Sequence, residues 1–343
     1  MTNTRFNILA LDGGGTRGLF PATILDCIAK GTGKSPTEIF DVIVGSATGG
    51  IITAALAAGL STDDIVDIYL NRADYILPSN FLRRLWNPLN LFAPKYPNSN
   101  LKQLLGKKIG DLKLGDVSNK YGTKPVFLFA ALDMSPEIPA GQIPEFKVVI
   151  YNSAHTEHRE ELLVDIALRS SAAVVNLPMY GTFTEGGNYA NDPGMVGLSF
   201  VLNAKQGANP DVSLLPDSKL GLGAPLDGIK MFSLGCGSTG SSFIPENRIG
   251  KGNWGLIRWL KYLVNLVIDT NMVAAQYYLD QILPEDNYLR INAWYGADDA
   301  PEVLRKKKLK IDVTDKQQLL AIRSYAEKKY AENQADILRF LGF

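Results

Sequence analysis

The stretch VIVGSATGGII contains two glycines that stand two positions before and two positions after Ala47. Gly45 and Gly49 reproduce the frame G-x-S-x-G, in which a nucleophilic serine is exposed on a sharp turn between a strand and a helix. The apolar run before the turn and the helical pattern after it meet the requirements of such an elbow. The central position, however, is Ala47, which carries no nucleophilic atom. Ser46 and Thr48 do not replace it, because they occupy flanking positions whose side chains would point away from the tip.

A second candidate site is the run LALDGGGTRGLF near the N-terminus. Gly13, Gly14 and Gly15 lie between a strand pattern and a helix pattern, where successive backbone N–H groups suit a phosphate or a developing oxyanion. A dinucleotide fingerprint, with glycines at 13, 15 and 18, is the rival interpretation and would make the chain an oxidoreductase. It fits less well, because Asp41 precedes the second strand instead of ending it. A tight turn without function is the third alternative.

The third candidate is FTEGGNYANDPG, which places the carboxylate of Glu185 on a glycine turn before the next helix. The chain has two histidines, His155 and His158, and neither lies in a glycine-framed or acidic pattern. A Ser-His-Asp triad therefore has no base here. If the elbow serves catalysis, its base must be a carboxylate, and Glu185 is the best placed one; a surface turn is the alternative.

Composition limits the class of protein. With 343 residues and 46% hydrophobic content, the chain can bury a large core, and 35 basic residues balance 35 acidic ones. No global charge therefore selects a DNA or RNA polymer. Cys27 and Cys236 provide neither a disulfide framework nor metal-ligand spacing, so we expect no metal site and a reducing, cytoplasmic location. No cofactor is expected either. The N-terminus lacks the apolar core of a signal peptide, and no stretch has the length and apolarity of a membrane span.

Short β-branched runs alternate with helical patterns along the chain. Strands are expected at 6–11, 42–44, 126–132, 146–151, 229–235 and 288–293, and helices at 19–30, 48–59, 62–72, 159–170, 194–205, 254–282 and 315–341. Nearly continuous apolar strands indicate burial on both faces, which predicts an α/β fold with a mostly parallel central sheet and helices on both faces. The Pro-rich segment 73–100 interrupts this rhythm and is a candidate lid.

Together these motifs resemble the patatin-like phospholipase family, whose fold is a three-layer sandwich. DGGGTRG (12–18) matches that family's glycine loop, GSATGG (45–50) matches its elbow except at the serine, and EGGNYANDP (185–193) is similar to its D-G-G turn with glutamate in place of aspartate. RSSAAVVNLPMY and FSLGCG are similar to two further family segments. The resemblance covers residues 5–240, and the helical part 241–343 is less typical, within an expected single domain of residues 1–343.

The resemblance implies a lipid acyl hydrolase with a serine–carboxylate dyad. Position 47 would hold the nucleophile, Glu185 the base, and the amides of the glycine loop the oxyanion, while Arg17 orders that loop or meets a lipid phosphate. With Ala47 the chain is expected to bind a substrate and not to acylate. Two explanations stay open: a deliberate serine-to-alanine change, which the intact loop favours, or a natural pseudoenzyme that senses lipid or nucleotide, which the glutamate favours.

Membrane phospholipid is the substrate class that the resemblance implies. Large apolar and basic side chains within 76–97 would suit a lid that touches the bilayer, or a cover over the core. Length and layout are also similar to bacterial antiphage effectors of this family that a cyclic dinucleotide activates. This similarity implies a cyclic dinucleotide activator and peripheral association with the inner membrane. A homo-oligomer is a candidate for the state of assembly.

Overall fold

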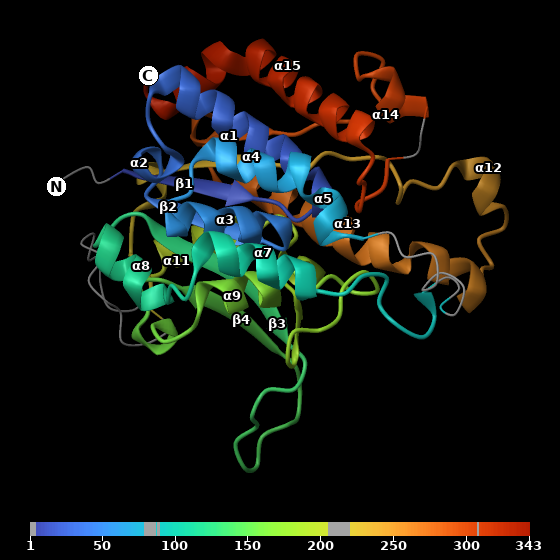
Figure 1. The fold of residues 1–343 in the computed structure, drawn as a ribbon, viewed down its shortest axis with the longest axis horizontal. Coiled ribbons are helices and arrows are strands. Elements are labelled where there is room, and N and C mark those ends of the chain that lie inside the picture. Colours follow the sequence, from blue (N-terminus) through green and yellow to red (C-terminus); the bar gives the residue numbers. More distant parts are fainter. Residues whose placement is uncertain (1–4, 79–86, 88–89, 205–219, 307–308) are drawn as a thin grey trace.

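The computed structural model describes residues 5–78, 87, 90–204, 220–306 and 309–343. Within these residues, seven strands form one sheet in the order β4-β3-β2-β1-β6-β7, with β5 also pairing with β3 (Figure 1). The strands are β1 (Phe6–Leu11), β2 (Val42–Ser46), β3 (Val126–Asp133), β4 (Lys147–Asn152), β5 (Phe183–Glu185), β6 (Ile229–Leu234) and β7 (Tyr288–Ile291). Neighbouring strands from β3 to β7 run parallel, and β4 and β5 lie antiparallel to β3. The predicted, mostly parallel α/β sheet is therefore confirmed.

Helices lie on both faces of this sheet. Along the chain they are α1 (Leu19–Thr32), α2 (Pro36–Ile39), α3 (Thr48–Ala58), α4 (Thr62–Asn71), α5 (Ala73–Ile76), α7 (Ser99–Ile109), α8 (Leu114–Tyr121), α9 (Leu163–Ser170), α10 (Gly187–Ala190), α11 (Gly194–Leu202), α12 (Glu246–Ile249), α13 (Leu256–Ile282), α14 (Glu302–Lys306) and α15 (Lys316–Leu341). All seven helices expected from the sequence are present. Helix α9 begins later than expected, because the Arg159 and Glu161 carbonyls accept hydrogen bonds from the start of α8.

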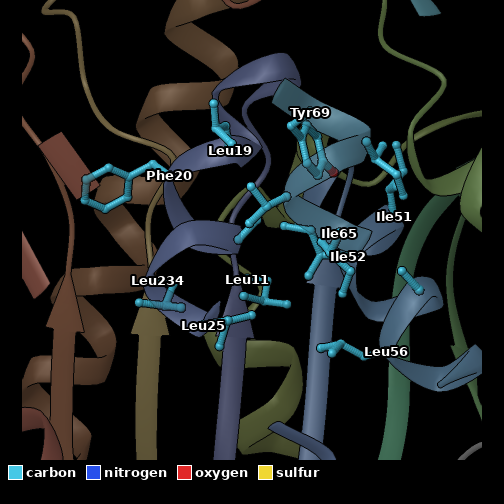
Figure 2. Packing of buried hydrophobic residues seen from close by; sticks show 14 of the residues in the cluster. Leu11, Leu19, Phe20, Leu25, Ile51, Ile52, Leu56, Ile65, Tyr69 and Leu234 are labelled. Atoms are coloured by element: carbon cyan, nitrogen blue, oxygen red, sulfur yellow. The ribbon is translucent and has the colours of Figure 1, made fainter. Parts of the chain in front are cut away.

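The alternation of side chains along β1 divides the core into two layers. Leu9 and Leu11 point to a cluster formed with α1, α3, α4, α7 and α9, against which α15 also packs. Figure 2 shows this layer, with Leu11 and Leu234 of the sheet among side chains of the covering helices. Ile8 and Ala10 point to the opposite cluster, which α11 and the end of α13 cover. Water is excluded from both faces of β1, β2, β3 and β6, and these strands are therefore largely apolar.

The segment that follows α5 is the expected lid, and the structure describes part of it. Phe81, Leu82, Arg83, Arg84, Trp86 and Leu89 lie outside the described residues. The buried amide of Asn87 bonds to the backbone of Phe92 and Ala93, and Leu91 and Phe92 are exposed. Further on, the amides of residues 95 and 96 donate to the carbonyls of residues 175 and 176, which fastens this segment beside the loop after α9. Whether it acts as a lid stays a prediction.

The C-terminal hundred residues complete the same sheet and core. Strand β7 pairs with β6, and α15 packs along α1, as Figure 1 shows at the top of the molecule. We therefore propose that the chain forms one domain. Within the described part of the chain, we find no helix with the length and apolarity needed to cross a bilayer.

Candidate active site

Ala47 lies on a strained turn between β2 and α3. Its backbone angles are φ 50° and ψ −116°, a region that alanine rarely adopts. A β-carbon on Gly45 would overlap the backbone of Gly49, and one on Gly49 would overlap the Leu11 carbonyl at the end of β1. Both glycines are therefore required by close packing between the turn and the neighbouring strand. This is the geometry of a nucleophile elbow whose central side chain is a methyl group.

The glycine loop leaves β1 and passes directly against the elbow. A β-carbon on Gly13 would lie 3.1 Å from the Ala47 β-carbon, so these two residues are immediate neighbours. The Gly13 amide donates to the Asn191 carbonyl at 2.9 Å, and this hydrogen bond removes it from the predicted set of oxyanion donors. For the amides of Gly14 and Gly15, no acceptor is found among the residues that the structure describes. We therefore narrow the proposed oxyanion donors to these two.

Glu185 ends strand β5 in a buried position beside the loop after α9. Its Oε1 atom accepts a hydrogen bond from the Val174 amide at 3.2 Å. Burial raises the pKa of Glu185 to about 7, and the Val174 bond opposes that rise. A carboxylate with a pKa near neutrality is suited to accept a proton from a serine hydroxyl and to return it. The following backbone is held by the Gly186 amide, which donates to the Ser170 carbonyl.

One cavity brings these groups together. Ala47, Glu185 and Gly15 all line it, so the structure places the proposed nucleophile position, base and one oxyanion donor around a common space. The rest of the wall is largely apolar and includes Ile51, Ile68, Ile76, Leu77, Leu101 and Leu177. Such a lining suits a hydrocarbon chain. Fold and site together define a hydrolase scaffold with an elbow, a glycine loop and a carboxylate.

Arg17 holds the glycine loop in shape. Its Nη1 atom donates to the Gly237 carbonyl at 2.9 Å, and its Nε atom lies 3.4 Å from the Gly14 carbonyl. Arg17 was expected either to order the loop or to meet a lipid phosphate. Its observed contacts are those of a residue that orders the loop. Arg17 also lines a second, polar cavity together with Gly13, and contact of its guanidinium with a lipid phosphate stays a prediction.

A buried ion cluster behind the glycine loop was not predicted from the sequence. Arg290, on β7, bonds to Asp12 at 2.5 Å and approaches Asp192 at 3.1 Å. Burial raises the pKa of Asp12 to about 7 despite this guanidinium, and burial also raises the pKa of Asp192. Asp12 precedes the glycine loop and Asp192 precedes α11. The cluster therefore joins two of the three motif segments through a residue that is distant from both in sequence.

Replacing Arg290 by methionine is expected to lower the free energy of unfolding by about 3–5 kcal/mol, because two buried carboxylates lose their counter-charge. The loss should be smaller at pH 5 than at pH 8, since protonation neutralises carboxylates whose pKa is raised. Urea denaturation at both pH values measures this. Arg323→Met is the matched control: it breaks an exposed pair with Glu327 and should cost less than about 1 kcal/mol. Equal losses in the two variants would contradict the assigned role.

Two asparagines, also not predicted, clamp the turn that carries Glu185. The Asn191 amide donates to Asn271 Oδ1 at 2.8 Å, and Asn271 Nδ2 donates to the Gly187 carbonyl at 2.9 Å. Asn271 belongs to α13, so this helix is fastened to the turn that carries Glu185. The Asn191 carbonyl of the same turn accepts the hydrogen bond from the Gly13 amide. An Asn-Asp-Pro sequence was recognisable as a helix start, but no local pattern indicated its partner on α13.

Residues 309–313 lie across the glycine loop. The Ile311 carbonyl accepts from the Thr16 amide at 2.9 Å, and a β-carbon on Gly15 would overlap it. Asp312 pairs with Lys95 and accepts from the Tyr96 hydroxyl at 2.9 Å. Ile311 and Asp312 line both the apolar cavity and the polar one. This segment therefore separates the two spaces.

The two histidines lie elsewhere and line a different cavity, on the side of α11. Within the described residues, His155, Glu157 and His158 bring ligand atoms within 4.8 Å of one another. The Asn152 amide donates to His158 Nδ1 at 3.1 Å, so the ring proton lies on Nε2, where it faces Glu157 at 3.2 Å. Nε2 is then a donor, and a metal would have to displace this arrangement. Neither ring belongs to the elbow site.

Comparison with known proteins extends these observations. Residues 9–193, more than half of the chain, match the family model described as patatin-like phospholipase. Patatin-like protein 2 of Arabidopsis thaliana is 27% identical over 327 residues, which cover 83% of this chain and 74% of that protein. A cGAMP-activated phospholipase of Pseudomonas aeruginosa is 27% identical over 317 residues, which cover 90% of this chain and 85% of that protein. VipD from Legionella pneumophila, a solved structure, aligns with a TM-score of 0.38 and 12% identity over 92% of this chain and 66% of its own.

The chain belongs to the patatin-like phospholipase family. By family it is therefore a hydrolase, as the resemblance of its motifs predicted. The matched region contains the glycine loop, the elbow and the turn with Glu185.

Proposed function

We propose that the chain is a phospholipid acyl hydrolase whose catalytic step is disabled at position 47. The observation that carries the proposal is the common apolar cavity lined by Ala47, Glu185 and Gly15. The proposal assigns to this cavity a nucleophile position, a base and one oxyanion donor, and only the nucleophilic atom is missing. The methyl group of Ala47 cannot form the acyl-enzyme, so this chain binds the acyl chain without cleaving the ester.

With serine at position 47, the hydroxyl oxygen attacks the ester carbonyl while Glu185 accepts its proton. The amides of Gly14 and Gly15 then donate to the negative oxygen of the tetrahedral intermediate. Collapse breaks the bond to the alcohol, which leaves as a lysophospholipid with the proton from Glu185. Water next attacks the acyl-enzyme while Glu185 takes its proton. Collapse of this second intermediate breaks the bond to the serine oxygen, which regains the proton from Glu185, so fatty acid is released and both serine and carboxylate are restored.

The identity of the products tests this assignment. The Ala47→Ser protein is incubated with phosphatidylglycerol vesicles and, separately, with a dispersed p-nitrophenyl ester, and mass spectrometry follows the lipids. We expect free fatty acid and lysophospholipid. Release of the head group instead, or cleavage of neither substrate by a folded protein, would contradict the proposal.

A natural pseudoenzyme that senses lipid or nucleotide is the second candidate. The intact apolar cavity around a methyl group favours it, because binding needs no nucleophile. It predicts that fatty acid or lysophospholipid binds equally well to the present chain and to the Ala47→Ser form, and that the serine form gains no hydrolysis. Calorimetric titration of both forms, alongside the product assay, separates the two candidates.

We also propose activation by a cyclic dinucleotide and peripheral contact with the inner membrane from the cytoplasm, either as a monomer or as a homo-oligomer. The cGAMP-activated relative from Pseudomonas aeruginosa, which aligns over most of both chains, supports the first of these. An activator raises the rate only by binding more tightly to the active arrangement. We expect cGAMP to raise the melting temperature and to stimulate vesicle hydrolysis by the serine form. Absence of both effects would remove this proposal.

A further inference from the structure

The first two turns of α13 expose apolar side chains. Its second half is anchored, since Leu279 is fully buried and Asn271 clamps the active-site turn. Near the start of the helix, apolar side chains are exposed: Leu256 by 73%, Ile257 by 91% and Leu260 by 61%. Figure 1 shows this end of α13 near α12, at the end of the molecule opposite the N-terminus. An apolar surface of this kind indicates a partner.

Aromatic rings and a guanidinium gather at the start of the helix. Trp254 contacts Trp259 and Tyr262, with ring centroids 5.3 and 5.6 Å apart. The guanidinium of Arg258 lies 4.1 Å from the centre of a Trp254 ring. Tryptophan and tyrosine with an adjacent cation are typical of the boundary between lipid tails and head groups, because these rings are apolar in the body and polar at the edge.

The sequence around the start of this helix is locally basic. Between Glu246 and Asp269 the sequence contains no acidic residue and four basic ones, Arg248, Lys251, Arg258 and Lys261. The whole chain is electrically balanced, so this excess is local. A negatively charged surface would complement it. A second copy docked through the same surface would bring like charge against like charge, which opposes that arrangement.

The exposed helix lies next to the candidate active site. Asn265 and Asp269 of α13 line the polar cavity together with Gly13 of the glycine loop and Lys95 of the segment after α5. That segment also exposes Phe92. Contact of this face with a bilayer would therefore place the glycine loop close to lipid head groups.

We propose that the α13 docking surface, made of Trp254, Leu256, Ile257, Arg258 and Leu260, binds the surface of an anionic phospholipid bilayer. The inference rests on the proposed function, since it assigns the membrane contact through which the lipid substrate is reached. Apolar side chains enter the interface while basic ones meet the phosphates.

Co-sedimentation tests the surface directly. The chain with Ala47 is used, so the vesicles stay intact, and they consist of phosphatidylcholine with or without phosphatidylglycerol. We expect stronger binding with phosphatidylglycerol and weaker binding at high salt. Ile257→Ser with Leu260→Ser should weaken binding about tenfold or more, because two exposed apolar side chains no longer enter the bilayer. Leu320→Ser, at a residue 48% exposed on α15, is the matched control and should bind unchanged.

A second variant, Arg248→Glu with Lys251→Glu, should abolish the preference for phosphatidylglycerol. Unchanged vesicle binding by the apolar double variant, or equal parent binding to both kinds of vesicle, would overturn the proposal. Sedimentation analysis provides a further test. If the parent is a dimer, and the apolar double variant is a monomer that still binds vesicles, the surface binds a second copy of the chain and the proposal is overturned.

Activity separates failure of this inference from failure of the proposed function. In the Ala47→Ser background, the apolar double variant should cleave a dispersed p-nitrophenyl ester at the parent rate and lose vesicle hydrolysis about tenfold. Parent and variant cleaving vesicles equally would overturn the docking surface alone. Failure of the parent serine form to cleave even the dispersed ester would overturn the proposed function instead.

Discussion

Replacing Ala47 by serine is expected to raise ester hydrolysis by about 10⁶-fold over the present chain, the size of the effect when an acyl-transfer nucleophile is removed or restored. The elbow already holds this position at φ 50°, and serine adds one oxygen to the methyl group that borders the cavity. The measurement is the initial rate of fatty acid release from phospholipid and of p-nitrophenol from a dispersed ester.

Ala47→Gly is the matched control for this gain. Glycine relieves the positive φ and enlarges the cavity without adding a nucleophile, so hydrolysis should stay at the level of the present chain. A rise in rate with glycine would show that backbone relaxation, and not the serine oxygen, produces the activity. Circular dichroism confirms that both variants keep the fold.

In the serine form, Glu185→Gln is expected to lower the rate by about 10⁴-fold, since the amide has nearly the same shape but accepts no proton. The carboxylate is buried, and its pKa is raised to about 7. Activity of the serine form should therefore rise with pH through about 7, because the base works when ionised and is protonated at lower pH. Rates of dispersed ester cleavage between pH 5 and 9 measure both effects.

Glu185→Asp separates the proton-accepting role from a role in packing. Aspartate keeps the carboxylate, so the variant should retain a rise of activity with pH, while the shorter side chain changes the rate by up to about 100-fold through altered placement. A glutamine variant as active as the parent, or a rate that is independent of pH in the parent, would assign the base to another group.

Local patterns determined the elements and the identity of the motif segments. The apolar runs of β1 and β2 are buried on both faces, and such runs indicate strands covered by helices whatever their neighbours are. Gly45 and Gly49 frame a turn whose close packing excludes β-carbons, and this requirement is visible in the spacing alone. Helices α7 and α8 and the three-residue strand β5 were not predicted. The apolar residues of α7 do follow a helical spacing, at Leu101, Leu104, Leu105 and Ile109, whereas α8 is short and largely polar and β5 is too short to show a period.

Only the tertiary structure decided which polar groups of these motifs are already paired. The Gly13 amide has the same sequence context as those of Gly14 and Gly15, yet Asn191 accepts its hydrogen bond. Arg290 reaches Asp12 across 278 positions, and Ile311 covers Gly15 across a similar separation. Hydrogen bonds and ion pairs form between whatever groups the fold brings within reach, and no local periodicity records such distant partners. The sequence therefore determined the parts of the site, and the packing of the C-terminal hundred residues decided how those parts are held and covered.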